Sequence, residues 1–97
     1  MNITNTIITR QGETTTANAR YQLEYNVTNG ILNRISATLS ELPSDDNPDG
    51  LYIGNIFWEN GSVNCSFQMT MKAVKFFEDF ESFMTEIKAD AEKLSIR

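Results

Sequence analysis

Two Asn-Gly pairs, Asn29-Gly30 and Asn60-Gly61, each separate two runs of apolar and polar residues. Asn-Gly is the strongest short-range signal for a β-hairpin, because both residues accept a positive φ at little steric cost. A long amphipathic segment, residues 71–94, follows the second pair. The pattern therefore predicts a hairpin, a second hairpin and a helix, in that order.

The first hairpin joins residues 20–28 to residues 31–39. Side chains alternate between the two faces of a strand, and directly paired residues share a face. A three-residue loop, Thr28-Asn29-Gly30, pairs Val27 with Ile31 and so brings the apolar faces of both strands together. The same register pairs Leu23 with Ile35. We therefore predict this loop, with Gly30 at a positive φ as its bulge residue.

The second hairpin is more ambiguous, because residues 51–58 are apolar on both sides. A three-residue loop over residues 59–61 places Tyr52, Ile56 and Trp58 on the face away from the helix, and a two-residue loop reverses that choice. By analogy with the first hairpin, we predict the three-residue loop.

Two further segments complete the expected fold. Ile3–Thr9 is rich in β-branched residues and predicts an edge strand, which Gln11-Gly12 would end. Glu41–Gly50 is rich in turn-forming residues and predicts a loop. The chain is then one α+β domain, residues 1–97, with an antiparallel meander of four to five strands and one C-terminal helix.

The expected helix has a wide apolar stripe, and Thr70 is placed to cap its N-terminus. We predict that Phe80 and its neighbours on the stripe pack on the sheet. Phe76 and Phe83 widen the stripe on one flank, and Phe76 or Phe83 would be left partly free for a second contact. The predicted stripe comprises Ala73, Phe77, Phe80, Met84, Ile87, Ala91 and Leu94.

Size and composition narrow the classes of protein. A chain of 97 residues makes one domain with a modest core. No apolar run approaches the roughly 18 residues of a membrane span, and the N-terminus lacks the pattern of a secretory signal, so we expect a cytoplasmic protein with no membrane partner. Cys65 is the single cysteine. It is in phase with Val63 and Phe67, which predicts a buried, inert thiol.

The net charge of −5 is concentrated in one segment. Residues 41–60 hold five acidic residues and no basic one. Such a balance disfavours binding to nucleic acid, whose phosphates require basic residues. Asp45–Gly50 resembles the start of an EF-hand loop, but its twelfth position is Ile56 instead of the bidentate Glu. We expect a turn-rich loop there and no metal site, although a weak cation site or a basic partner remains open for this loop.

The chain offers little for catalysis. It has no histidine, which removes histidine-based acids, bases, triads and zinc sites. Glu78, Asp79 and Glu81 point in different directions on the expected helix, which predicts solvated charges. Since a glycine-rich phosphate loop is also missing from the sequence, we expect neither a cofactor nor an enzymatic activity.

The sequence therefore favours a non-catalytic interaction module that forms a homodimer or binds another protein. One helix covers only one face of a sheet, and the apolar inventory exceeds what that contact can bury. The predicted interaction surface comprises Tyr52, Ile56, Trp58, Phe76 and Phe83.

Two alternatives remain. The order of strands and a C-terminal helix resembles the topology of the β4-α unit of the Whirly, Pur-type and coactivator single-strand binders. That likeness concerns topology alone and implies a sheet that binds single-stranded nucleic acid. Stacking of bases on Tyr52 and Trp58, with Arg20 and Arg34 beside them, would suit such a platform. The other alternative is a small acidic inhibitor or decoy, in which the segment 41–60 occupies a basic site on a partner.

Overall fold

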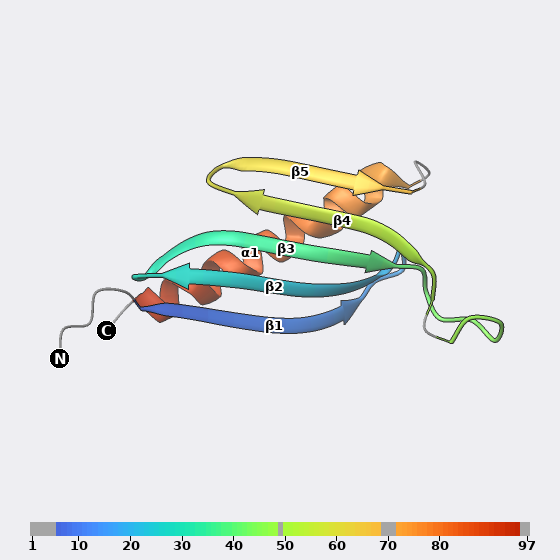
Figure 1. Cartoon of the computed structure of the whole chain (residues 1–97), viewed down its shortest axis with the longest axis horizontal. Coiled ribbons are helices and arrows are strands. Elements are labelled where there is room, and N and C mark those ends of the chain that lie inside the picture. The colour runs from blue at the N-terminus through green and yellow to red at the C-terminus, as the bar shows by residue number, and fades with distance from the viewer. Residues whose placement is uncertain (1–5, 49, 69–71, 96–97) are drawn as a thin grey trace.

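Five antiparallel strands form a single sheet, and one helix lies across one of its faces (Figure 1). The computed structural model describes residues 6–48, 50–68 and 72–95. Neighbouring strands in the chain are neighbours in the sheet, so the α+β meander expected from the sequence is confirmed. The elements are β1 (Ile7–Thr15), β2 (Arg20–Thr28), β3 (Ile31–Ser40), β4 (Tyr52–Glu59), β5 (Ser62–Phe67) and α1 (Ala73–Ser95).

The edge strand β1 continues past the predicted break at Gln11-Gly12. It pairs with β2 along all nine of its residues, from Ile7 opposite Thr28 to Thr15 opposite Arg20. The weak strand propensity of glycine is outweighed here by a continuous ladder of backbone hydrogen bonds. The predicted end of the strand at Thr9 was therefore wrong.

The first hairpin has a two-residue turn, not the predicted three-residue loop. Asn29 and Gly30 both have positive φ, 52° and 81°, as a type I′ turn requires. Thr28 consequently pairs with Ile31. The predicted positive φ of Gly30 is confirmed, but its role as a bulge residue was wrong.

A β-bulge just after this turn brings the apolar side chains of β2 and β3 back onto the same face of the sheet. Val27 pairs with Leu32 and Asn26 pairs with Arg34, so Asn33 is one extra residue on β3. An extra residue shifts the alternation of the faces by one position. The apolar residues of β2 and β3 thereby share the helix face even though the turn is short, and the predicted register, with Leu23 opposite Ile35, was wrong.

The second hairpin also has a two-residue turn, with φ values of 51° at Asn60 and 84° at Gly61. Trp58 therefore pairs with Val63, and Ile56 pairs with Cys65, on the face that carries the helix. The prediction that Ile56 and Trp58 lie on the opposite face was wrong, because both Asn-Gly pairs adopt the shorter loop.

A second bulge accommodates the doubly apolar strand β4. Leu39 pairs with Gly54 and Ser40 pairs with Tyr52, so Ile53 is the extra residue and is buried. A Cβ atom on Gly54 would lie 2.0 Å from the backbone oxygen of Ser66, so only glycine fits where β4 passes β5. The bulge places Ile53 and Ile56 in the core together, although they are three residues apart.

The helix buries a different stripe from the one predicted. Phe76 is only 1% exposed, whereas Phe77 is 38% exposed. Phe76 contacts the Phe67 ring edge-on, and Phe83 packs edge-on against Tyr21 at 4.8 Å between ring centroids. The flank with more aromatic rings therefore faces the sheet. The predicted partial exposure of Phe76 or Phe83 was wrong, because both are buried. The predicted cap, Thr70, lies outside the described residues. The buried helix residues are Phe76, Phe80, Phe83, Ile87 and Ala91.

Candidate functional site

Asp79 on α1 binds three side chains of the β1–β2 end of the sheet. One carboxylate oxygen accepts hydrogen bonds from Tyr21 at 2.6 Å, Thr16 at 2.8 Å and Asn18 at 3.0 Å. Burial alone would raise the pKa of the Asp79 carboxyl, but these donors outweigh burial and hold that pKa below its usual value. Burial and the hydrogen bond to Asp79 raise the pKa of the Tyr21 hydroxyl. The expectation that Asp79 is a solvated charge was wrong.

Asp90 makes the equivalent contact three helical turns later. It accepts a hydrogen bond from the Tyr25 hydroxyl, and Arg10 on β1 lies 3.3 Å from the same oxygen. Burial and the contact with Asp90 raise the pKa of Tyr25. Eleven residues turn a helix through about three full turns, so Asp79 and Asp90 lie on one flank, beside the buried stripe. The spacing of eleven residues between Asp79 and Asp90 is the feature of the sequence that could have indicated two contacts between the helix and the sheet.

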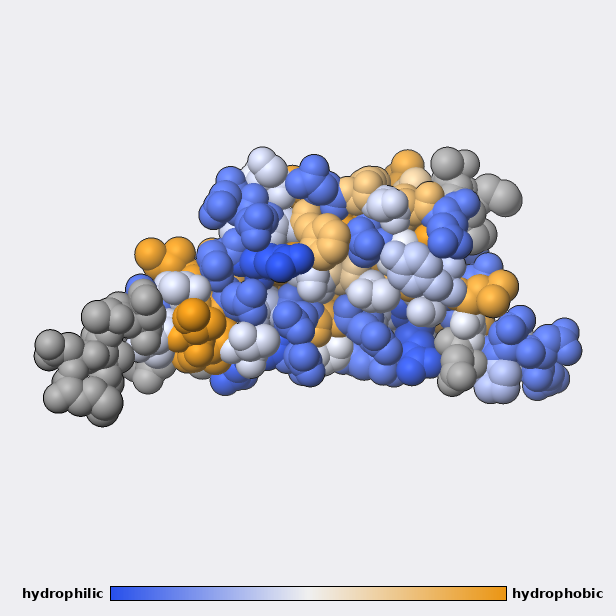
Figure 2. Space-filling model, in the orientation of Figure 1, coloured by the Kyte–Doolittle hydropathy of each residue, from blue (hydrophilic) through white to orange (hydrophobic). Residues whose placement is uncertain are grey.

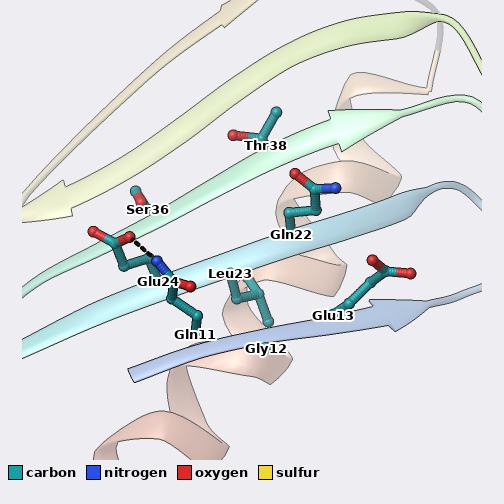
Figure 3. Close-up of a pocket in the computed structure, with 8 residues that line it drawn as sticks. All are labelled: Gln11, Gly12, Glu13, Gln22, Leu23, Glu24, Ser36 and Thr38. Atoms are coloured by element: carbon teal, nitrogen blue, oxygen red, sulfur yellow. Dashed lines mark hydrogen bonds between the residues drawn. The ribbon is translucent and has the colours of Figure 1, made fainter. Parts of the chain in front are cut away.

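The face of the sheet away from the helix is polar. Figure 2 shows it as a mostly hydrophilic surface with separate apolar spots. A shallow hollow of about 480 Å³ lies over its β1–β2–β3 side. Figure 3 shows polar side chains from three strands around this hollow, with Gln11 donating a hydrogen bond to Glu24 at 2.9 Å. The lining residues are Gln11, Gly12, Glu13, Gln22, Leu23, Glu24, Ser36 and Thr38.

Both arginines of this polar face are already paired with glutamates. Arg20 lies 3.1 Å from Glu13, and Arg34 lies 4.0 Å from Glu59 and over the Phe57 ring. A wide, open hollow also buries far less of a ligand than the clefts of enzymes do. Among the described residues, no group of three or more His, Cys, Asp or Glu side chains could hold a metal ion. The hollow therefore provides neither free cations for phosphates nor an enclosed site for a substrate.

The five residues predicted as an interaction surface do not come together on the exterior. Ile56, Phe76 and Phe83 are buried in the core of the single chain. Trp58 is half-buried against this core, with the Lys88 ammonium 5.6 Å from its ring centroid. Only Tyr52, 47% exposed, is largely accessible. Tyr52 and Trp58 also fail to form a joint stacking platform, because the register places Trp58 on the helix face.

Exposed apolar side chains instead lie along β5 and in the first turns of α1. Val63 is 49% exposed, Val74 is 70% exposed and the Phe77 ring contacts the Phe67 ring at 5.8 Å. Cys65 lies between Val63 and Phe67 on the strand and is exposed, so the predicted burial of its thiol was wrong. The reason is that α1 crosses the sheet diagonally and leaves much of β5 uncovered (Figure 1). We name this surface the β5 strip: Val63, Cys65, Phe67, Val74 and Phe77.

The two edge strands of the sheet differ in chemistry. β5 holds no charged residue, whereas β1 holds Arg10 and Glu13. Charged residues on an edge strand discourage pairing with another chain, and an uncharged edge leaves its backbone groups available. Sequence reasoning missed this site because it assigned the odd-numbered residues of β5 to the core.

Neither the hydropathy of the helix nor similarity to known proteins assigns a function to this site. Within the described residues, the single helix is not apolar enough to cross a membrane. Comparisons of the chain with protein-family models, with curated proteins and with solved structures find no match.

Proposed function

We propose that this protein is a non-catalytic interaction module that self-associates. The observation that carries the proposal is the β5 strip, in which exposed apolar side chains of an edge strand and of the first turns of α1 are linked by the Phe67–Phe77 ring contact. Val63, Val74 and Phe77 are each more than one third exposed. Several exposed apolar side chains on one edge of a sheet are typical of protein–protein contact sites.

The available polar groups support a role without catalysis. The chain has no histidine. Asp79 and Asp90 are occupied by hydroxyl, amide and guanidinium donors that attach the helix to the sheet. A general base or a nucleophile needs a lone pair that a substrate can reach, and these carboxylates already use theirs for structure.

The single-strand-binding alternative has weaker support. The polar face presents Arg20 and Arg34, but each faces a glutamate of its own. A nucleic-acid platform gains most of its affinity from unpaired basic residues that release counterions from phosphates. The net charge of −5 adds to the repulsion.

Sedimentation velocity over a hundredfold concentration range tests the proposal. We expect the weight-average mass to rise with concentration, because the β5 strip becomes buried between copies. Phe77→Lys should shift the association to higher concentration by about tenfold or more, since a charge would have to be buried without a partner.

Ile7→Lys is the matched control. Ile7 is also an exposed apolar residue, 65% accessible, but it lies on the opposite edge strand. This variant should associate as the unmodified chain does. A chain that stays monomeric throughout the range would overturn the proposal, and an equal effect of the two variants would remove the β5 strip as its site.

A further inference from the structure

The backbone of β5 presents its free groups through its odd-numbered residues. Glu59 and Ser62 close a two-residue turn, and such a closing pair exchanges backbone hydrogen bonds. Gln68, six residues further on, donates its backbone N–H to Ile53 at 2.7 Å. Backbone groups alternate in direction along a strand. The even-numbered residues therefore point to β4, and Val63, Cys65 and Phe67 point their N–H and C=O groups outward.

These outward groups have no strand beyond them in the described part of the sheet, whose order ends at β5. The pairing of β4 and β5 also contains no register shift. The outer edge is therefore regular over the whole strand and can accept another strand.

The sequence of this edge is self-complementary about Cys65. In an antiparallel pair related by a twofold axis, one residue lies opposite its own copy, and that pair shares a face. With Cys65 on the axis, the outward N–H and C=O groups of Cys65 meet those of its copy. Val63 then lies opposite Phe67 of the second copy, and both of these residues also point their backbone groups outward.

The side chains fit the same register. Val63 and Phe67 lie on the helix face, so their pairing joins two apolar side chains across the axis. The Phe77 ring, which already contacts Phe67, lies beside this pair and extends its cover. On the other face, Asn64 lies opposite Ser66, which pairs two uncharged polar side chains. No charge of β5 opposes its own copy, because the strand has none.

We propose that a second copy of this chain docks along β5 by antiparallel strand addition centred on Cys65. The inference rests on the proposed self-association and gives it a register. The two sheets then become one continuous sheet, with both helices on the same side. The contact involves one short strand and a few flanking residues, fewer than the 20–30 residues per side of a standard interface, so we expect a dissociation constant of the order of micromolar.

Amide hydrogen exchange provides the first test. The outward amides of Val63, Cys65 and Phe67 should exchange fast at low concentration, where the chain is monomeric. They should become protected as the concentration rises through the association range. The amides of Asn64 and Ser66, which point to β4, serve as the internal control, because their protection should not depend on concentration.

Disulfide cross-linking provides the second test and reports the register. The Cα atoms of a hydrogen-bonded antiparallel pair lie about 5.5 Å apart, within the range that a disulfide spans. Mild oxidation should therefore link Cys65 to its copy. In the Cys65→Ser background, chains with Asn64→Cys should link to chains with Ser66→Cys at least several-fold faster than either chain links to itself.

The outcomes separate the register from the proposed function. A dimer with freely exchanging odd-numbered amides and no preference for the mixed 64–66 cross-link would overturn strand addition while leaving self-association in place. A monomer at all concentrations would overturn both. Val63→Glu should weaken the dimer by about tenfold or more, with Ile7→Glu on the other edge as the control, since a carboxylate would then face Phe67 twice in each dimer.

Discussion

Asp79 contributes more to the attachment of the helix to the sheet than its position among the charged residues of the helix indicates. Its single oxygen accepts three hydrogen bonds, from a tyrosine, a threonine and an asparagine of the sheet side. Hydrogen bonds to an ionised acceptor are stronger than those between neutral groups. The carboxylate is partly buried, so removing its charge leaves three donors without a strong acceptor.

We predict that stability falls at acidic pH partly through Asp79. Its pKa is lower in the folded than in the unfolded chain. The contribution is therefore fully present above the unfolded value of about 4, and it is lost as the pH falls through the folded pKa. Urea denaturation of Asp79→Asn should show a lower free energy of unfolding than the unmodified chain at pH 7.

The difference between the two proteins should shrink as the pH falls through the folded pKa of Asp79, because the unmodified carboxyl is then itself protonated. Glu78→Gln is the matched control, because Glu78 is the exposed neighbour on the same helix. It should change stability by less than about 0.5 kcal/mol. A pH-independent difference between Asp79→Asn and the unmodified chain would contradict the ionic role.

The approximate position of each strand and of the helix could be predicted from the sequence. Which side chains of each element face the core could not. The Asn-Gly pairs identified both turns, and the alternation gave β2 its bounds. The registers depended on Asn33 and Ile53, single extra residues that no periodic pattern marks. A bulge reverses the parity on which the prediction of Tyr52, Ile56 and Trp58 as one exposed face relied.

The helix showed the same limit. Both possible stripes share Phe80, Ile87 and Ala91, so periodicity alone could not choose between Phe76 and Phe77. The choice came from tertiary contacts, because Phe67 and Tyr21 offer ring edges to Phe76 and Phe83. A one-position difference on the helix decided which phenylalanine belongs to the core and which to the β5 strip.

A pair of alanine substitutions tests this orientation of α1. Phe80→Ala should lower the free energy of unfolding by about 3–5 kcal/mol, through lost burial and the cavity that remains. Phe77→Ala should cost less than about 1.5 kcal/mol when measured on the monomer, because its ring is already partly in solvent. Denaturation at low protein concentration makes the measurement. Equal losses would show that the helix is rotated toward the stripe predicted from sequence.

At the scale of the whole molecule, net charge and exposed apolar surface have opposite effects on self-association. The chain is elongated, 53 × 25 × 19 Å, and carries a net charge of −5. Two such molecules repel each other, although β5 itself is uncharged. Any association through the β5 strip must overcome this repulsion.

We therefore predict that added salt strengthens self-association. Screening shortens the range of the repulsion from about 10 Å at 0.1 M salt to about 3 Å at 1 M. Sedimentation at 0.05 M and 0.5 M sodium chloride should show the larger assembled fraction at high salt. Weaker assembly at high salt would indicate that attractive charge pairs hold the copies together. Fluorescence anisotropy with labelled single-stranded DNA is the companion measurement, and tight binding at low salt would favour the nucleic-acid alternative.

The two tyrosine–aspartate contacts also determine the direction of the helix. Asp79 and Asp90 are about 16 Å apart along a helix axis, whereas Tyr21 and Tyr25 are about 13 Å apart along a strand. The long tyrosine side chains take up this difference of about 3 Å, so the two contacts hold two separate points of α1 against the same strand. Held in this way, α1 runs diagonally from the end of β5 toward β1 (Figure 1). The attachment at one side of the sheet therefore determines which corner on the other side remains uncovered.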